Sequence, residues 1–212
     1  MLAWLGGLLA APAVSAPVTG HRSQVTPFAA VVPGYVMRFP HDKGSHPDFR
    51  LEWWYLTGWL NAATRPLGFQ ITFFRARPEL KQGNPSAFTP RQILIAHAAI
   101  SDPAQGRLIH AQRAARAGFD LAGAAEGRTR VWIDEWRLEQ KENAYRAAIA
   151  AQEFSLDLAF DATQAPIRQG QDGYSRKGRA PESASYYYSL PHLKVGGTVT
   201  REGQSRPVLR AD

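Results

Sequence analysis

The sequence predicts an all-β protein built as one domain, and three observations carry that prediction. Aromatic residues make up 11% of the 212 residues, and 18 glycines and 15 prolines supply many turn positions. Several short runs alternate between apolar and polar residues, which is the period of a half-buried strand. A length near 200 residues also suits a single all-β domain. We therefore expect about eight antiparallel strands in a meandering barrel or sandwich.

The N-terminal region predicts an exported protein. Residues 1–16 are almost entirely apolar and end in V-S-A, the small-x-small pattern of a signal-peptidase site. A hydrophobic N-terminal arm is the alternative. We expect a signal peptide at residues 1–16, cleaved after Ala16, and a periplasmic or secreted mature chain. An approach segment at 17–38 and the folded domain at 39–212 then follow.

The first half of the domain predicts three strands. The run "LEWWYLTGWL" at 51–60 is followed by a turn at 61–66 and by "GFQITFFRAR", which has Phe69, Ile71 and Phe73 on one face. Two such runs with a short polar connection predict an antiparallel hairpin. A proline-rich loop then leads to "RQILIAHAAISDP", the third strand.

The second half is less uniform. Alanines and arginines allow a short helix at 108–117, and "RTRVWIDEWRLEQ" reads as a strand with Trp132, Trp136 and Leu138 on one face. "EFSLDLAFDAT" alternates most cleanly of all. A glycine-rich loop and two strands around Pro191 complete the pattern.

Composition excludes several function classes. The net charge is +7, but the 25 Lys and Arg residues are scattered, so we expect no nucleic-acid partner. The absence of cysteine excludes disulfides, thiolate metal sites and cysteine nucleophiles. No Walker-type loop, G-x-G-x-x-G or H-E-x-x-H motif occurs. "GYSRKG" lacks the second glycine of a nucleophile elbow.

Glu52 is the residue for which the sequence most directly poses the choice between a structural and a catalytic role. Strand alternation places it on one face with Trp54 and Leu56. A carboxylate among such side chains must be paired or protonated, because burial of a lone charge is prohibitive. A structural ion pair with Arg75 or Arg50 is the favoured explanation. The alternative is a carboxyl with a raised pKa that acts as a general acid.

Histidines raise two further questions. The loop "HDKGSHPD" gathers His41, Asp42, His46 and Asp48, which are ligand types for a cation. Such residues more often cap turns, so we expect no metal and no cofactor. His97 lies in the middle of a strand and is expected to be a core histidine with hydrogen-bonded ring nitrogens.

The tryptophans and the three tyrosines 186–188 predict an aromatic pocket for an apolar or planar ligand. Ordinary core packing is the alternative, although three consecutive tyrosines cannot all face the core. The residues predicted to bind a ligand are Trp53, Trp54, Tyr55, Arg75, His97 and Tyr187.

Five segments together resemble the lipocalin-like secreted hydrolase family that includes carotenoid hydratase. They are "FPHDKGSHPDFRLEWWYLTGWL", "GFQITFFRAR", "AHAAISDP", "QGQDGYSRKG" and "ASYYYSLPHL", spread from Phe39 to Gly196. The resemblance implies a calycin-type architecture of two lipocalin-like β-barrels. This chain corresponds to the first barrel and looks truncated, because the family's second barrel is absent from it.

The resemblance also implies a function. We expect an exported lipocalin-like domain of a hydrolase or hydratase that binds a hydrophobic or lipid-like small molecule. If it is catalytic, acid–base chemistry would use Glu52 as the acid, with Asp172, Tyr174 and His46 as partners. The alternative is a non-catalytic structural or partner-binding β-barrel module. The missing C-terminal barrel is the expected protein partner, and peripheral membrane association is left open.

Overall fold

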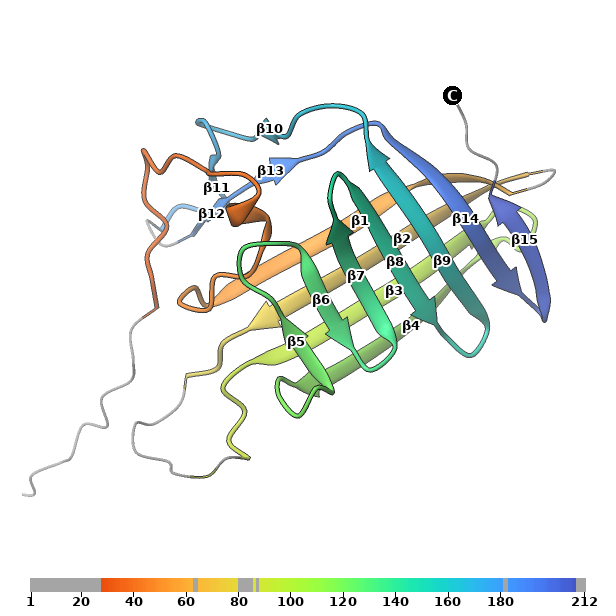
Figure 1. Ribbon diagram of the computed structural model, residues 1–212, viewed down its shortest axis with the longest axis horizontal. Coiled ribbons are helices and arrows are strands. Elements are labelled where there is room, and N and C mark those ends of the chain that lie inside the picture. The colour runs from red at the N-terminus through yellow and green to blue at the C-terminus, as the bar shows by residue number, and fades with distance from the viewer. Residues whose placement is uncertain (1–27, 63–64, 80–85, 87, 181–182, 209–212) are drawn as a thin grey trace, which may run out of the picture.

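The computed structural model describes residues 28–62, 65–79, 86, 88–180 and 183–208 (Figure 1). The expected signal peptide and the first part of the approach segment lie outside the described residues. Within the described part, no helix is long and apolar enough to cross a membrane.

Eleven strands form one antiparallel sheet in the order β4-β3-β2-β1-β15-β14-β9-β8-β7-β6-β5. Their bounds are β1 (Leu51–Ala62), β2 (Arg65–Ala76), β3 (Ile93–Asp102), β4 (Arg107–Arg116), β5 (Ala122–Ala124), β6 (Arg130–Ile133), β7 (Trp136–Lys141), β8 (Ala144–Ala150), β9 (Phe154–Ala162), β14 (Leu193–Arg201) and β15 (Gln204–Val208). The prediction of an all-β antiparallel fold is confirmed, although the strands outnumber the eight expected.

Four short strands and one 3-10 turn complete the described elements. They are β10 (Ile167–Arg168), β11 (Tyr174–Arg176), β12 (Ala184–Tyr186), β13 (Tyr188–Ser189) and η1 (His41–Lys43). β10 pairs with β13 and β11 pairs with β12.

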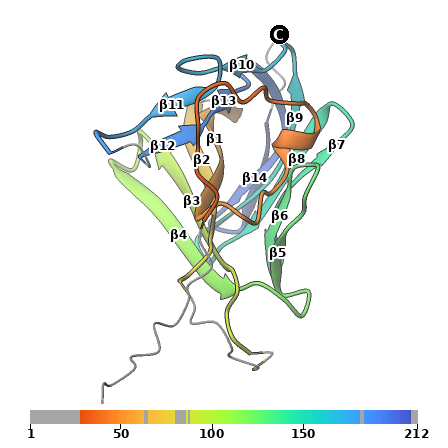
Figure 2. The ribbon, with the colours of Figure 1, turned by 90° about the vertical axis from the view of Figure 1, so that its left-hand side faces the viewer.

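The sheet wraps around a single apolar core. In Figures 1 and 2, β1–β4 form one wall and β5–β9 with β14 form the facing wall. β1 joins β15 through the one residue pair Ala62–Val208, and on the other side β4 contacts β5 and β6. Side chains that point inward from both walls therefore meet in the space between them.

Alternation determines which side chains fill that space. Phe69, Ile71 and Phe73 of β2 are all buried, as their common face predicted. Every second residue of β9 from Phe154 to Phe160 is buried as well. Full burial of each such side chain stabilises the fold by about 1.5–3 kcal/mol.

The predicted hairpin of β1 and β2 is confirmed, with a tighter turn than expected. The strands pair continuously from Leu51–Ala76 to Ala62–Arg65. The ladder therefore extends into the segment 61–66, which was expected to be turn throughout.

The helix expected at 108–117 is wrong. Residues Arg107–Arg116 form β4, which pairs with β3 along its whole length. Ile109 is buried while its neighbours Leu108 and His110 are exposed. Cross-strand pairing and one buried face outweigh the helical preference of the alanines, since propensity is a weak prior.

The single strand expected at 128–140 is also wrong, because the segment is a hairpin. Asp134 has φ 51° in the turn between β6 and β7. The buried residues of β6 are Val131 and Ile133. Trp132 faces the other way, and its ring lies so close to Gly123 that a Cβ there would overlap it.

The loop of residues 38–50, here called the N-terminal loop, lies across one end of the sheet between the two walls (Figure 2). The carbonyl of Lys43 accepts hydrogen bonds from Trp54 Nε1 on one wall and from Thr129 Oγ1 beside the other, each 3.0 Å long. The loop is therefore tied to both walls.

A close backbone approach fixes the same loop to the turn before β6. The amide of Ser45 donates to the carbonyl of Ala125 at 2.8 Å. A Cβ at Gly44 would overlap the backbone of Gly127. Glycine is required at position 44 because only it lets the two chain segments come this close.

Candidate functional site

The two faces of β1 carry two different groups of side chains. Glu52, Trp54 and Leu56 lie on the inner face, as alternation predicted, and Trp53 and Tyr55 lie on the outer face. The predicted site residues therefore divide between two places.

Glu52 is the centre of a hydrogen-bond network on the inner face. Its Oε2 accepts from Arg75 Nε at 2.6 Å and from Ser45 Oγ at 3.0 Å. Its Oε1 accepts from the His46 amide at 2.7 Å and lies 2.9 Å from His46 Nδ1. Both carboxylate oxygens thus have two partners.

Arg75 is fully buried and uses its remaining donors on the N-terminal loop. Its Nη2 donates to the carbonyls of His46 at 3.0 Å and Phe49 at 2.8 Å. The favoured structural explanation of Glu52 is confirmed, with Arg75 as its partner; Arg50 lies on the surface near Glu79. Arg75 was predicted to bind a ligand, but its guanidinium is occupied and has no exposed surface.

The ionisation of Glu52 follows from these contacts. Burial alone raises the pKa of Glu52, but the hydrogen bond from His46 and the charge of Arg75 outweigh it and hold this pKa below its ordinary value. The raised pKa that a general acid requires is therefore not found, and we expect Glu52 to be ionised at neutral pH.

His46 lies between two carboxylates. Its Nδ1 contacts Glu52, and its Nε2 lies 3.4 Å from Asp42 Oδ1. The hydrogen bond to Glu52 raises the pKa of His46 despite partial burial. Burial raises the pKa of Asp42, but hydrogen bonds from His41 and the Arg38 amide lower it overall to about 2. Two ionised carboxylates therefore flank one imidazole.

The outer face carries a hollow of about 500 Å³, here called the outer hollow. It is lined by Trp53, Tyr55, Thr57, Gln70, Thr72, Phe74 and Lys177. Alternate residues of β1 and β2 form its floor, and Lys177 enters from the segment that follows β11. Aromatic walls with a few polar groups are typical of small-molecule sites.

Tyr187 stands beside the outer hollow and contacts two of its residues. Its hydroxyl lies 2.8 Å from the Tyr55 hydroxyl, and its ring centroid lies 6.4 Å from that of Trp53. Lys177 Nζ lies 4.7 Å from the centre of the Tyr187 ring. The hydrogen bond with Tyr55 raises the pKa of Tyr187 to about 12. The Tyr187 hydroxyl is therefore protonated at neutral pH.

His97 is an exposed residue and not the core histidine that we expected. It lies opposite Thr72 in the ladder of β2 and β3, and its ring centroid is 5.8 Å from that of Phe74. Its neighbours Ala96 and Ala98 point to the opposite face of β3 and are buried instead. The imidazole is thus next to the outer hollow and open to solvent.

The remaining predicted residues lie elsewhere. Trp54 is on the inner face, where its indole bonds the Lys43 carbonyl. Asp172 is exposed and pairs with Arg168 at 3.3 Å. Tyr174 lies in β11, opposite Tyr186. Of the four predicted catalytic residues, the structure joins only Glu52 and His46 by hydrogen bonds.

Sequence reasoning missed five residues of the outer hollow, and the first of them is Thr57 of β1. Gln70, Thr72 and Phe74 occupy alternate positions of β2, so the same alternation that identified the core face could have identified them. Lys177 carried no such signal, because it lies in a glycine-rich loop whose path the sequence does not indicate.

Comparisons with known proteins agree with one another. The AttH-like family model matches residues 30–209. A crystal structure assigned to AttH from Nitrosomonas europaea is 50% identical, with a TM-score of 0.76, and the match covers 85% of this chain and 55% of that one. Kievitone hydratase from Nectria haematococca is 12% identical, with a TM-score of 0.60, covering 88% and 52% of the two chains. No curated protein matches. The chain thus spans about half the length of these two solved structures.

Proposed function

The chain belongs to the AttH-like family, and from that premise we propose that it is the small-molecule-binding half of a hydrolase or hydratase. Its ligand is a hydrophobic or lipid-like molecule that lies in the outer hollow. The observation that carries the proposal is the hollow itself, about 500 Å³ between aromatic side chains of two adjacent strands. Its volume and apolar lining lie in the range of small-ligand pockets, and it is shallow and open to solvent.

The polar groups around the hollow suit a ligand with one polar end. The paired hydroxyls of Tyr55 and Tyr187 can donate a hydrogen bond, and Lys177 places a positive charge beside them. His97, next to Phe74, adds an imidazole, a side chain that commonly serves as a general acid or base. Aromatic surface would hold the apolar body while these groups orient the polar end.

Acid–base addition of water is the reaction that this arrangement supports best. His97 takes a proton from the attacking water and then returns it to the neighbouring carbon of the substrate. The hydroxyl pair of Tyr55 and Tyr187 donates a hydrogen bond to the negative charge that develops on the substrate between these two steps. A hydratase is among the solved structures of this fold, so hydration is the first reaction to assay. Glu52 has no place in this scheme, because Arg75 and His46 occupy it on the opposite face.

The binding proposal can be tested with a dansylated fatty acid as the probe. Energy transfer from tryptophan should report binding, and Trp53→Ala should weaken affinity at least about tenfold, since loss of one aromatic wall costs about 1.4 kcal/mol or more. Trp132→Ala is the matched control, because Trp132 lies on β6. Equal affinity in wild type and Trp53→Ala would place the ligand elsewhere.

A second candidate function is favoured by exposed apolar residues along the same strand. Leu51, Tyr55 and Trp59 share the outer face of β1 and are 51%, 44% and 68% exposed. Contiguous exposed apolar surface often marks a protein contact. The partner would be a further β-domain, since the match covers only 55% and 52% of the two solved structures.

Trp59→Lys separates the two candidates, because Trp59 does not line the outer hollow. If the face is a contact for a β-domain, a second copy of this chain can take the place of that domain. The wild type should then self-associate in sedimentation experiments, and the lysine variant should remain monomeric. If the face serves only a small ligand, both proteins should sediment alike and bind the dansyl probe equally.

A further inference from the structure

The N-terminal loop holds a carboxylate that lacks a permanent cationic partner. The Asp42 side chain is 4% exposed, and its ion-pair partners among the described residues are the histidines 41 and 46. Glu52, by contrast, has the buried guanidinium of Arg75. A buried carboxylate is costly without a compensating positive charge. Asp42 is therefore a buried carboxylate whose charge is balanced by hydrogen bonds and by two histidines, without an Arg or Lys partner among the described residues.

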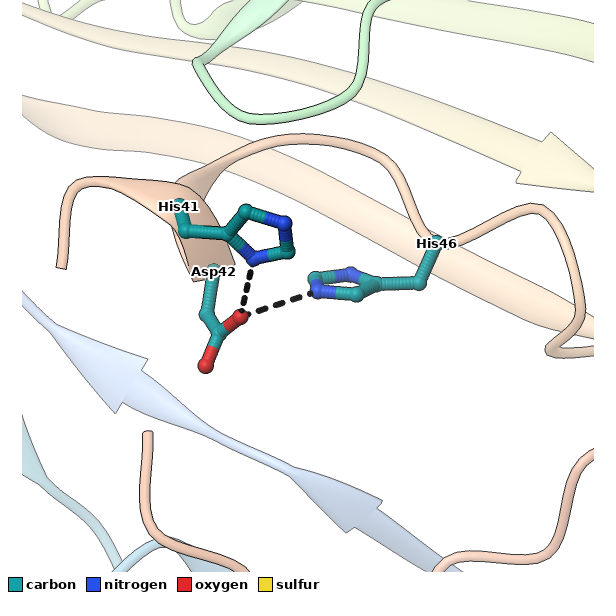
Figure 3. A group of neighbouring side chains, drawn as sticks. All are labelled: His41, Asp42 and His46. Atoms are coloured by element: carbon teal, nitrogen blue, oxygen red, sulfur yellow. Dashed lines mark hydrogen bonds and ion pairs between the residues drawn. The ribbon is translucent and has the colours of Figure 1, made fainter. Parts of the chain in front are cut away.

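The three side chains converge on one point, as Figure 3 shows. Asp42 Oδ1 lies 2.8 Å from His41 Nδ1 and 3.4 Å from His46 Nε2. All three potential ligand atoms lie within 4.8 Å of one another. Ligand atoms at about 2.0–2.2 Å from one tetrahedral metal ion are roughly 3.3–3.6 Å apart. Coordination would therefore require the His41 ring to move, and that ring is largely exposed.

The surroundings already orient two of these ligands. His46 Nδ1 contacts Glu52 Oε1 at 2.9 Å, which directs its Nε2 toward Asp42. Asp42 Oδ2 accepts from Tyr35 Oη at 2.8 Å and from the Arg38 amide at 2.7 Å, which leaves Oδ1 facing the histidines. Carboxylate–histidine–metal arrangements of this kind fix the tautomer and the direction of a metal-binding imidazole.

We infer that His41, Asp42 and His46 form a binding site for one divalent transition-metal ion. Two imidazole nitrogens and one carboxylate oxygen suit zinc and its first-row neighbours. His41 is largely exposed, so the ion can enter from solvent. Three protein ligands leave at least one coordination position for water or another small molecule. The site holds the N-terminal loop at the end of the sheet and adds a Lewis acid to the protein.

Zinc binding to the full chain, after removal of metal with EDTA and dialysis, tests the inference by isothermal titration calorimetry. Wild type should bind one Zn²⁺, and His41→Ala should bind it at least about tenfold more weakly, since one of three ligands is lost. The side chain of His41 hydrogen-bonds only Asp42 among the described residues, and alanine keeps the backbone hydrogen bond from Gly44, so this variant should fold normally. His110→Ala is the matched control, because His110 is an exposed histidine on β4.

Cobalt gives an independent readout of the same site. Co²⁺ added to wild type should produce a visible absorption band of bound cobalt, and Asp42→Asn should weaken it strongly. Circular dichroism and thermal unfolding confirm that each variant is folded. A wild-type chain that takes up no metal, or a His41→Ala variant that binds as tightly as wild type, would overturn the inference. Either result would leave the three residues as a network that only holds the loop.

Discussion

The inner and outer faces of β1 and β2 use neighbouring residues for opposite purposes. On the inner face, Arg75 is fully buried and Glu52 is largely buried, and both carboxylate oxygens of Glu52 and the guanidinium of Arg75 have hydrogen-bond partners. On the outer face, Trp53 and Tyr55 line an open hollow. Consecutive residues of one strand therefore belong to two different environments: Glu52 to a fully hydrogen-bonded ion pair, and Trp53 to an aromatic surface that is open to solvent. Complete hydrogen bonding indicates a structural role for the inner face, whereas the aromatic surface open to solvent is what the binding proposal rests on.

Breaking the ion pair of Glu52 and Arg75 should have the largest effect on the free energy of unfolding. Arg75→Met removes the positive charge beside Glu52 and leaves loop carbonyls without a donor, so the free energy of unfolding should fall by about 3–5 kcal/mol. Urea denaturation measures the change. The control is Arg146→Met, which breaks the exposed pair with Asp157 and should cost about 1 kcal/mol or less. Equal losses in the two variants would refute the assignment of a structural role to Arg75.

Two adjacent phenylalanines of β2 allow the two faces to be compared with the same side chain. Phe73 is fully buried and Phe74 lines the outer hollow. Phe73→Ala should lower the free energy of unfolding by about 3 kcal/mol or more, because it leaves a cavity. Phe74→Ala should cost less than half as much but weaken binding of the dansyl probe. Denaturation and probe titration on both variants check this, and a reversal of the two patterns would contradict the assignment of faces.

Glu52→Gln should have a smaller effect, and on stability alone. The amide keeps the shape of the carboxylate but loses its charge, which should cost about 1–3 kcal/mol. Affinity for the dansyl probe and any hydration activity should stay at the wild-type level. Loss of turnover in a variant that remains folded would return Glu52 to the mechanism.

The smallest effect concerns the tyrosine pair of the outer face. Tyr55→Phe removes the hydrogen bond that raises the pKa of Tyr187 to about 12, so this pKa should fall toward its ordinary value of about 10. NMR titration of the tyrosine rings measures it. Tyr186→Phe is the control, because Tyr186 Oη bonds the backbone of Val32 instead.

The same pair sets a pH dependence. Because the folded protein holds the Tyr187 proton more tightly than the unfolded chain, this contribution to stability is complete below about pH 10. It is lost as the pH rises from there through about 12. Wild type should therefore lose more stability than Tyr55→Phe over that interval, and parallel curves would contradict the assignment.

Strand parity explains which predictions succeeded. The hairpin of β1 and β2 and the core face of β9 could be predicted because alternation over eight or more residues is a local property. The prediction of a single strand at 128–140 failed because Asp134 adopts a left-handed turn conformation, which the residue type alone does not predict. The helix that the composition allowed at 108–117 does not form, because pairing of Arg107–Arg116 with β3 outweighs the helical preference of its alanines.

The candidate sites divide in the same way. The cost of burying a charge predicted that Glu52 needs a partner. The same cost limited the expected partners to nearby arginines, Arg75 and Arg50. His97 was misplaced because a strand pattern of small residues does not say which face is covered. The convergence of His41 and His46 on one oxygen of Asp42 depends on the path of the N-terminal loop across both walls.

The sequence by itself determined the all-β class, the two faces of each clearly alternating strand, and the need to neutralise Glu52, because each follows from local periodicity and the cost of burying charge. Tertiary structure alone decided that Arg75 is the partner, that Lys177 and Tyr187 reach the outer hollow, and that three metal-ligand types meet at Asp42. Those outcomes depend on loops whose paths are set by contacts between residues far apart in the chain, and no local pattern encodes them.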